Sequence, residues 1–151
     1  MDYPTQKAVI LIGHGSRATG ADDDMERVSV GLREKLGITV ETCRLEGRGT
    51  TFTEAFEKCV ALGAKEMLVI PYFLHFGVHL RRDIPKLLQE SLTKHPEMKL
   101  ILGRHLGFDK ALIDLVAKRI EESEGLADIR DLSPTPKDKI PTKKAVKEKD
   151  E

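Results

Sequence analysis

The sequence predicts an α/β fold in which a four-stranded parallel sheet carries helices on both faces. Three observations support this fold class. Apolar segments typical of strands alternate four times with amphipathic segments typical of helices, between residues 7 and 123. The helical segments are long enough to cross from one parallel strand to the next. Right-handed crossovers then distribute the helices over both faces of a doubly wound sheet.

The predicted strands are short runs rich in apolar residues. Residues 8–12 are continuously apolar and lead into Gly13, which is typical of a strand buried on both faces. Pro71 cannot donate a hydrogen bond to a neighbouring strand, so it indicates where the third strand leaves the sheet. The four predicted strands occupy residues 7–13, 38–46, 66–74 and 98–105.

The predicted helices carry apolar residues every three or four positions, and residues typical of helix ends flank them. Gly37 ends the first helix, and Thr51 or Thr53 caps the second. Asp83 and Pro85 suit the first turn of the third helix. The four predicted helices occupy residues 21–37, 51–65, 81–95 and 109–123.

Composition favours one soluble globular domain followed by a polar tail. The chain has 151 residues, enough for one core, with 40% hydrophobic and 33% charged residues. We expect the domain to occupy residues 1–125. Residues 126–151 are rich in proline and lysine and offer little apolar surface for burial, so we expect them to form a disordered tail.

Charge and cysteine content exclude several classes of function. Lys+Arg and Asp+Glu both number 25, so bulk charge gives no reason to expect nucleic-acid binding. The N-terminal apolar run is too short to span a bilayer and does not resemble a signal peptide, so we expect a cytoplasmic protein without a membrane partner. Cys43 and Cys59 are not spaced as CxxC, which argues against a disulfide framework or a structural zinc site.

The candidate site lies in the loops that follow the predicted strands, because ligands of open parallel sheets bind beyond the carboxyl ends of the strands. If the strand order is 2-1-3-4, the first and third strands are neighbours. A crevice then opens between the loops that follow them. Only His95 among the five histidines falls at the opposite end of the sheet. The other four lie in the carboxyl-end loops: His14, His75, His79 and His105.

The first of these loops begins with GHGS, residues 13–16. The flanking glycines let the backbone turn sharply and leave the His14 imidazole exposed at the sheet edge. His14 is then a metal ligand, a general base, or a turn residue with a local hydrogen bond. Alternatively, Gly15 and Ser16 could offer N–H groups to a phosphate. The segment is neither GxGxxG nor a Walker loop, which weakens the nucleotide interpretation.

The loop after the third strand contains two histidines four positions apart, His75 and His79. Gly77 between them favours a loop, so the two imidazoles need not share one helical face or act as a pair. Each is either functional or an ordinary polar residue. Arg81 and Arg82 follow; they could bind carboxylates or form a solvated first helical turn.

Four further residues each leave two interpretations open. Glu46, at the end of the second strand, could take a proton or attract a cation, or it could be a solvated acid at a strand tip. Asp83 is either a helix cap or a catalytic acid. Phe73 and Phe76 either belong to the core or line a crevice for a flat aromatic ligand.

Two segments carry a more specific pattern: VILIGHGSR at residues 9–17 and PYFLHFGVHLRRDIP at residues 71–85. An acid, Glu46, ends the strand between them, and Leu106–Gly107 precede the last helix. In this order the chain resembles the small class II tetrapyrrole chelatases, the short sirohydrochlorin chelatases that insert cobalt or, in relatives, nickel or iron. The match spans about residues 7–122.

The resemblance implies a flavodoxin-like chelatase fold and a lyase that inserts a divalent metal into sirohydrochlorin. Co²⁺ is the first expectation and Ni²⁺ or Fe²⁺ the alternatives, serving cobalamin, coenzyme F430 or siroheme synthesis. The implied metal ligands are His14 and His79. His75 is left open as a further ligand, because it and Phe76 stand where many relatives carry serine and proline. A homodimer with the site at or near its interface is also implied.

The chemistry of insertion suggests roles for the remaining residues. Two neutral imidazoles can hold the ion while leaving coordination positions open for water and pyrrole nitrogens. The same imidazoles or Glu46 could accept the two pyrrole protons. The substrate has eight carboxylate groups, which call for cations and N–H donors. The residues expected to bind it are Ser16, Arg17, Phe76, Gly77, Arg81 and Arg82. No organic cofactor is required.

Two other functions stay open. A non-catalytic metal or tetrapyrrole carrier on the same fold would bind its cargo stoichiometrically, without turnover. A phosphate- or flavin-binding module would use residues 13–17 as an anion loop. The histidine-rich loops favour metal over phosphate or flavin, whereas only kinetics separates an enzyme from a carrier.

Overall fold

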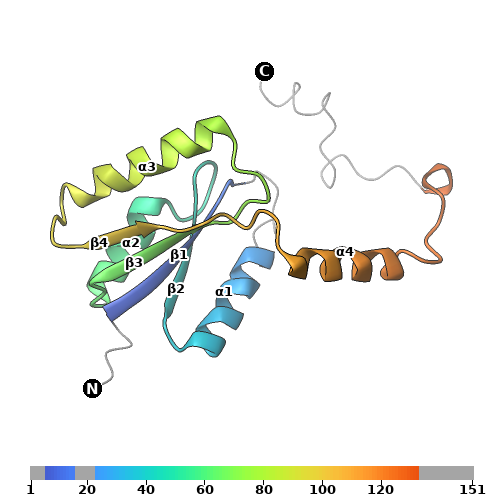
Figure 1. Ribbon diagram of the computed structural model, residues 1–151, viewed down its shortest axis with the longest axis horizontal. Helices are drawn as coiled ribbons and strands as arrows, with labels where there is room; N and C mark the ends of the chain where they lie inside the picture. Colours follow the sequence, from blue (N-terminus) through green and yellow to red (C-terminus); the bar gives the residue numbers. More distant parts are fainter. Residues whose placement is uncertain (1–5, 16–22, 133–151) are drawn as a thin grey trace. The chain divides into compact units, whose positions relative to one another are not determined.

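The computed structural model describes residues 6–15 and 23–132. Within these ranges one sheet of four parallel strands is formed, in the order β2-β1-β3-β4 (Figure 1). The predicted parallel sheet and its strand order are therefore confirmed. The strands are β1 (Lys7–Gly13), β2 (Thr39–Arg44), β3 (Glu66–Pro71) and β4 (Lys99–Leu102).

A helix follows each strand, as predicted. Thr51 caps α2, because its hydroxyl accepts a hydrogen bond from the Glu54 N–H at 3.2 Å. Gly37 follows α1 with a positive φ angle of 64°, consistent with its predicted role at the end of the helix, and Gly63 follows α2 with φ of 92°. In the described ranges the helices are α1 (Asp23–Leu36), α2 (Phe52–Ala61), α3 (Val78–Leu92), α4 (Lys110–Glu122) and the short 3₁₀ helix η2 (Ile129–Asp131).

The chain divides into two compact units, Met1–Phe108 and Asp109–Glu151. The first unit holds the sheet and α1 to α3, and the second holds α4 and η2. The predicted domain boundary at residue 125 stays a prediction. Most of the expected tail, residues 133–151, lies outside the described residues.

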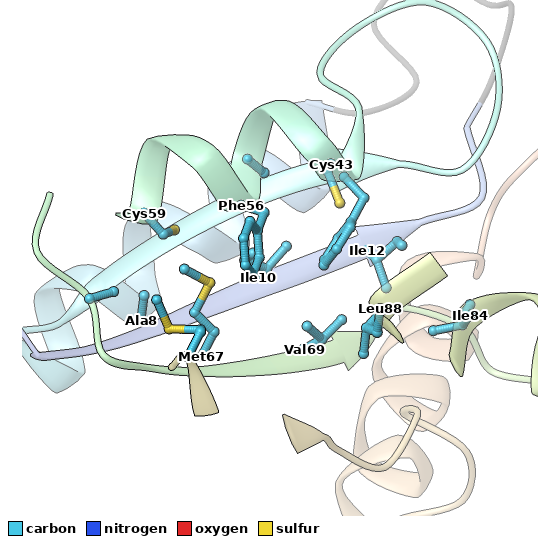
Figure 2. Packing of buried hydrophobic residues seen from close by; sticks show 14 residues of the cluster. Ala8, Ile10, Ile12, Cys43, Phe56, Cys59, Met67, Val69, Ile84 and Leu88 are labelled. Atoms are coloured by element: carbon cyan, nitrogen blue, oxygen red, sulfur yellow. The ribbon is translucent and has the colours of Figure 1, made fainter. Parts of the chain in front are cut away.

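Alternating side chains of the sheet meet helices on its two faces. On one face Leu11 and Val40 pack with Met25 of α1. On the other face Ile10, among other strand residues, packs with residues of α2 and α3, including Phe56. Figure 2 shows Phe56 beside Ile10 in this larger cluster. The helices that follow β1 and β3 therefore cover opposite faces, which confirms the doubly wound arrangement.

The larger cluster anchors the helix that borders the candidate site. Ile84 of α3 is fully buried, and Leu88 one turn later is 6% exposed. Burying side chains of this kind contributes about 1.5–3 kcal/mol each. Figure 2 shows Leu88 beside Val69 of the sheet, with Ile84 on the other side of Leu88. The face of α3 next to this buried stripe is thereby fixed against the carboxyl edge of the sheet.

The start of α3 corrects one prediction. The helix begins at Val78, three residues before the expected start, with Gly77 as an extended N-cap. Its first turn closes through a hydrogen bond from the Arg81 N–H to the Gly77 carbonyl at 3.1 Å. His79 therefore lies in the first helical turn and not in a loop. Asp83 is not the cap, and the helix continues through Pro85.

No helix in residues 6–15 and 23–132 combines the length and the apolar character needed to cross a membrane.

Candidate functional site

A pocket of about 370 Å³ opens at the carboxyl edge of the sheet, between the ends of β1 and β2 and the side of α3. It contains His14 and Glu46, so two of the predicted catalytic residues meet in one place. The sequence placed them on separate loops, and the neighbouring strands β1 and β2 bring those loops together. The lining residues are His14, Leu45, Glu46, Leu80, Asp83, Lys86, Leu87 and Glu90.

Backbone hydrogen bonds extend the pairing of β1 and β2 as far as these two residues. The Leu45 N–H donates to the Gly13 carbonyl at 3.0 Å, and the Glu46 N–H donates to the His14 carbonyl at 3.1 Å. Gly15 follows with φ of 105°. A Cβ atom at Gly15 would lie 1.9 Å from the Glu46 carbonyl oxygen. Only glycine permits this approach, which explains the residue after His14 in the GHGS segment.

The imidazole of His14 is supported from the neighbouring strand β3. The Tyr72 N–H donates to the Ile12 carbonyl at 2.8 Å, so the chain after β3 leaves the sheet alongside the chain after β1. Phe73 then places its ring 6.0 Å from the His14 ring, with the two planes at 89°. Phe73 is half-buried and packs against the core. It acts as a wall that orients His14.

The structure places His75 and His79 near the same edge but not in the pocket. His75 lies in the loop between β3 and α3, whereas His79 lies in the first turn of α3, and both are exposed. Within the described part of the chain, no three or more His, Cys, Asp or Glu side chains form a group that could hold a metal ion. The ligand pair His14 and His79 therefore stays a prediction.

The predicted substrate-binding residues fall into two sets. Phe76, Gly77 and Arg81 form a local structure, because the Arg81 Nε donates to the Phe76 carbonyl at 3.0 Å and Gly77 caps α3. Arg82 is exposed beside them. Ser16 and Arg17 lie outside the described residues.

Sequence reasoning missed two charged residues of the pocket, Lys86 and Glu90. They follow Asp83 by three and seven positions, so all three project from one face of α3. No ion pair or side-chain hydrogen bond engages the ammonium of Lys86 anywhere in the described ranges. The i, i+3, i+7 spacing was a usable signal.

The two cysteines are buried, free and unsuited to binding a metal. Burial, and to a lesser extent the charge of Cys59, raises the pKa of Cys43 to about 12. Burial, followed by the charge of Glu41, raises the pKa of Cys59 to about 11. Both thiols are therefore protonated at neutral pH, and a thiolate is the form that binds metal.

His95, at the other end of the sheet, makes structural contacts. Its Nε2 lies 3.0 Å from a Glu57 carboxylate oxygen, and its ring lies 5.5 Å from the ring of Phe56. These contacts tie the end of α3 to α2. The histidines at the carboxyl edge of the sheet therefore remain the candidates for metal binding or catalysis.

Comparisons with known proteins agree on one family. The family model CbiX matches residues 8–123. The chain is 28% identical over 124 residues to a sirohydrochlorin ferrochelatase of Priestia megaterium, covering 82% of this chain and 46% of that protein. It is 30% identical over 139 residues to a sirohydrochlorin cobaltochelatase of Methanopyrus kandleri, covering 78% of this chain and 97% of that protein.

A solved structure agrees with the fold. The sirohydrochlorin chelatase SirB from Bacillus subtilis subspecies spizizenii, in complex with cobalt, matches with a TM-score of 0.71 and 26% identity. The match covers 78% of this chain and 50% of that chain. The chain thus spans about half the length of some relatives and nearly the full length of others.

Proposed function

The chain belongs to the CbiX family, and from this premise we propose that it inserts a divalent metal ion into sirohydrochlorin. The observation that carries the proposal is the meeting of His14 and Glu46 in one pocket at the carboxyl edge of the sheet. The loop with His75 and the helical turn with His79 follow the strand next to β1. The names of the relatives, which are sirohydrochlorin chelatases, support the substrate.

We propose Co²⁺ as the metal substrate, with Ni²⁺ and Fe²⁺ as alternatives. Imidazole binds all three ions, so the protein side alone does not select among them. Relatives are named for cobalt and for iron. The product would enter cobalamin, coenzyme F430 or siroheme synthesis according to the metal inserted. No organic cofactor takes part in the proposed reaction.

In this proposal His14 and His79 bind the ion through neutral imidazole nitrogens, and His75 either adds a third ligand or contacts the macrocycle. Two or three ligands leave positions open for water and for the incoming pyrrole nitrogens. The ring gives up two N–H protons as its four nitrogens bind the M²⁺ ion. Glu46 accepts one of these protons, and an imidazole released by the ion accepts the other. Charge balances, because the doubly deprotonated ring and the divalent ion form a neutral core.

The substrate carboxylates would meet cations around the pocket. A volume of about 370 Å³ is at the small end of ligand pockets, so we propose that the ring lies over the loops and that one carboxylate arm enters. Lys86 would bind that arm. The other expected contacts are Ser16, Arg17, Phe76, Gly77, Arg81 and Arg82.

We also propose that the chain acts as a homodimer in the cytoplasm. The half-length match to some relatives supports pairing, because two copies would supply an equivalent number of domains. The free, buried thiols are consistent with a reducing compartment. The residues assigned to the chelatase domain are 1–125, and the family match ends close to that boundary, at residue 123.

A spectral assay tests the proposed function. Purified protein, Co²⁺ and sirohydrochlorin are mixed, and the change in the absorption spectrum of the ring is followed over time. We expect insertion to proceed faster with the protein than in buffer that contains only Co²⁺ and sirohydrochlorin. A rate equal to the buffer rate, with each of the three metals, would remove the proposal.

A further inference from the structure

We propose that His105, in the loop after β4, is a positioning residue for the segment that carries the candidate ligands His75 and His79. The inference rests on the proposed function for its activity readout and on the structure for its mechanism. His105 is half-buried, and its ring lies 5.3 Å from the ring of Phe76 at 43°. Phe76 directly follows His75.

A second contact joins the same two loops. The Gly107 N–H donates to the Phe73 carbonyl at 3.3 Å. Gly107 has φ of 54°, and a Cβ atom there would lie 3.0 Å from His105 Nε2. The loop after β4 therefore holds the loop after β3 at two points, Phe73 and Phe76, which lie on either side of His75.

Phe73 and Phe76 each connect the loop to a candidate ligand. The ring of Phe73 contacts the ring of His14. The carbonyl of Phe76 accepts the hydrogen bond from the Arg81 Nε, which ties the loop to the helical turn containing His79. The ring of His105 thus packs against the segment that runs from Phe73, which contacts His14, to the helical turn that contains His79.

The contact of His105 is one of packing. An offset or tilted ring pair depends on shape and on the charge distribution of the rings. His105 is outside the lining of the pocket that contains His14 and Glu46. An aromatic ring without nitrogen should therefore preserve its role, whereas alanine should remove it.

The experiment compares the full-length wild type with His105→Phe and His105→Ala. His95→Ala is the matched control, because His95 also packs its ring on a phenylalanine, Phe56, at the other end of the sheet. Hydrogen–deuterium exchange of peptides covering residues 72–82 reports on the loop. The spectral assay gives kcat and KM for each variant.

We expect His105→Ala to speed exchange in residues 72–82 by about five- to tenfold and to lower kcat by a similar factor. His105→Phe should keep the exchange rate and kcat close to their wild-type values, and His95→Ala should change neither quantity. Wild-type exchange in His105→Ala would overturn the inference. So would a His105→Phe variant as impaired as alanine, or equal effects from His95→Ala.

Gly107→Ala is the second variant, for the case that His105→Ala does not fold. Its Cβ would displace the His105 ring without removing it, and we expect the same local rise in exchange. Unchanged exchange there would also overturn the inference. Failure of the proposed function is distinguishable, because a wild type without chelatase activity would leave the exchange comparison intact.

Discussion

The Glu46 N–H donates a hydrogen bond to the His14 carbonyl at 3.1 Å, beyond the last paired residues of β1 and β2. This bond places an imidazole and a carboxylate in one pocket although they are 32 positions apart in the sequence. It depends on Gly15, where a side chain would collide with the backbone of Glu46.

Substituting Gly15 tests that dependence. Gly15→Ala puts a Cβ on a residue with φ of 105° and directly against the Glu46 carbonyl, so the two loops must separate. We expect a fall of about 1–3 kcal/mol in the free energy of unfolding from the backbone alone, and loss of chelatase activity. Denaturant unfolding and the spectral assay measure the two effects. Gly31→Ala is the control, because a Cβ there meets open space.

The candidate ligands differ in their expected importance. His14→Ala and His79→Ala should each lower turnover by more than about a hundredfold, because loss of outer-shell residues alone commonly costs 10–100-fold. His75→Ala should weaken turnover without abolishing it. The spectral assay with Co²⁺ compares the three. If His75→Ala proved the most damaging, the ligand pair would be wrongly assigned.

Lys86 is expected to act on substrate affinity. Lys86→Ala should raise KM for sirohydrochlorin by about two- to fivefold with little change in kcat, since exposed ion pairs are individually weak. Lys86→Arg should keep KM low. Lys94→Ala is the control. It removes the same charge just after the C-terminal end of α3, outside the pocket, and should leave KM unchanged. A fall in kcat without a change in KM would contradict a binding role.

Stability should fall at high pH because of the buried thiols. The pKa of Cys43 is raised from 9.0 to about 12 and that of Cys59 from 9.0 to about 11. Above pH 9 the unfolded chain loses these protons while the folded protein keeps them, so the unfolded state is favoured progressively. Below pH 9 both states are protonated and this contribution is constant.

Denaturant unfolding at pH 7.5 and pH 10.5 checks this expectation. The wild type should lose free energy of unfolding between the two values, and Cys43→Ala should lose less, since alanine cannot ionise. An equal loss in both proteins would mean that other groups control the alkaline limit.

The sequence was informative where a residue's position follows from strand order. His14, Glu46 and the loop after β3 were placed at one edge because parallel strands end on the same side, and the structure agrees. Their roles as ligands or bases could not be read in the same way, since coordination depends on side-chain distances that spacing does not fix.

The start of α3 could not be predicted from its local sequence. Asp83 and Pro85 are good first-turn residues, which favoured a start at residue 81. The helix instead begins after Gly77, so that Leu80 packs against the core and Ile84 is fully buried in it. Tertiary packing decided the start, and the earlier start places His79 in the first turn of the helix.

The contact between Phe76 and His105 could not be read from spacing at all. The residues belong to different loops, and only the pairing of β3 with β4 brings those loops together. The sequence did place His105 at the carboxyl edge, but it offered no partner for the ring.

Turnover with substrate in excess tests the central claim most directly. Sirohydrochlorin and Co²⁺ are supplied in about tenfold molar excess over the protein, and product is quantified from its absorption spectrum, with His14→Ala as the comparison. The proposed chelatase should form many equivalents of metallated ring per protein, faster than the variant and faster than buffer. Product that stops at one equivalent, or a rate shared by wild type, variant and buffer, would contradict the account.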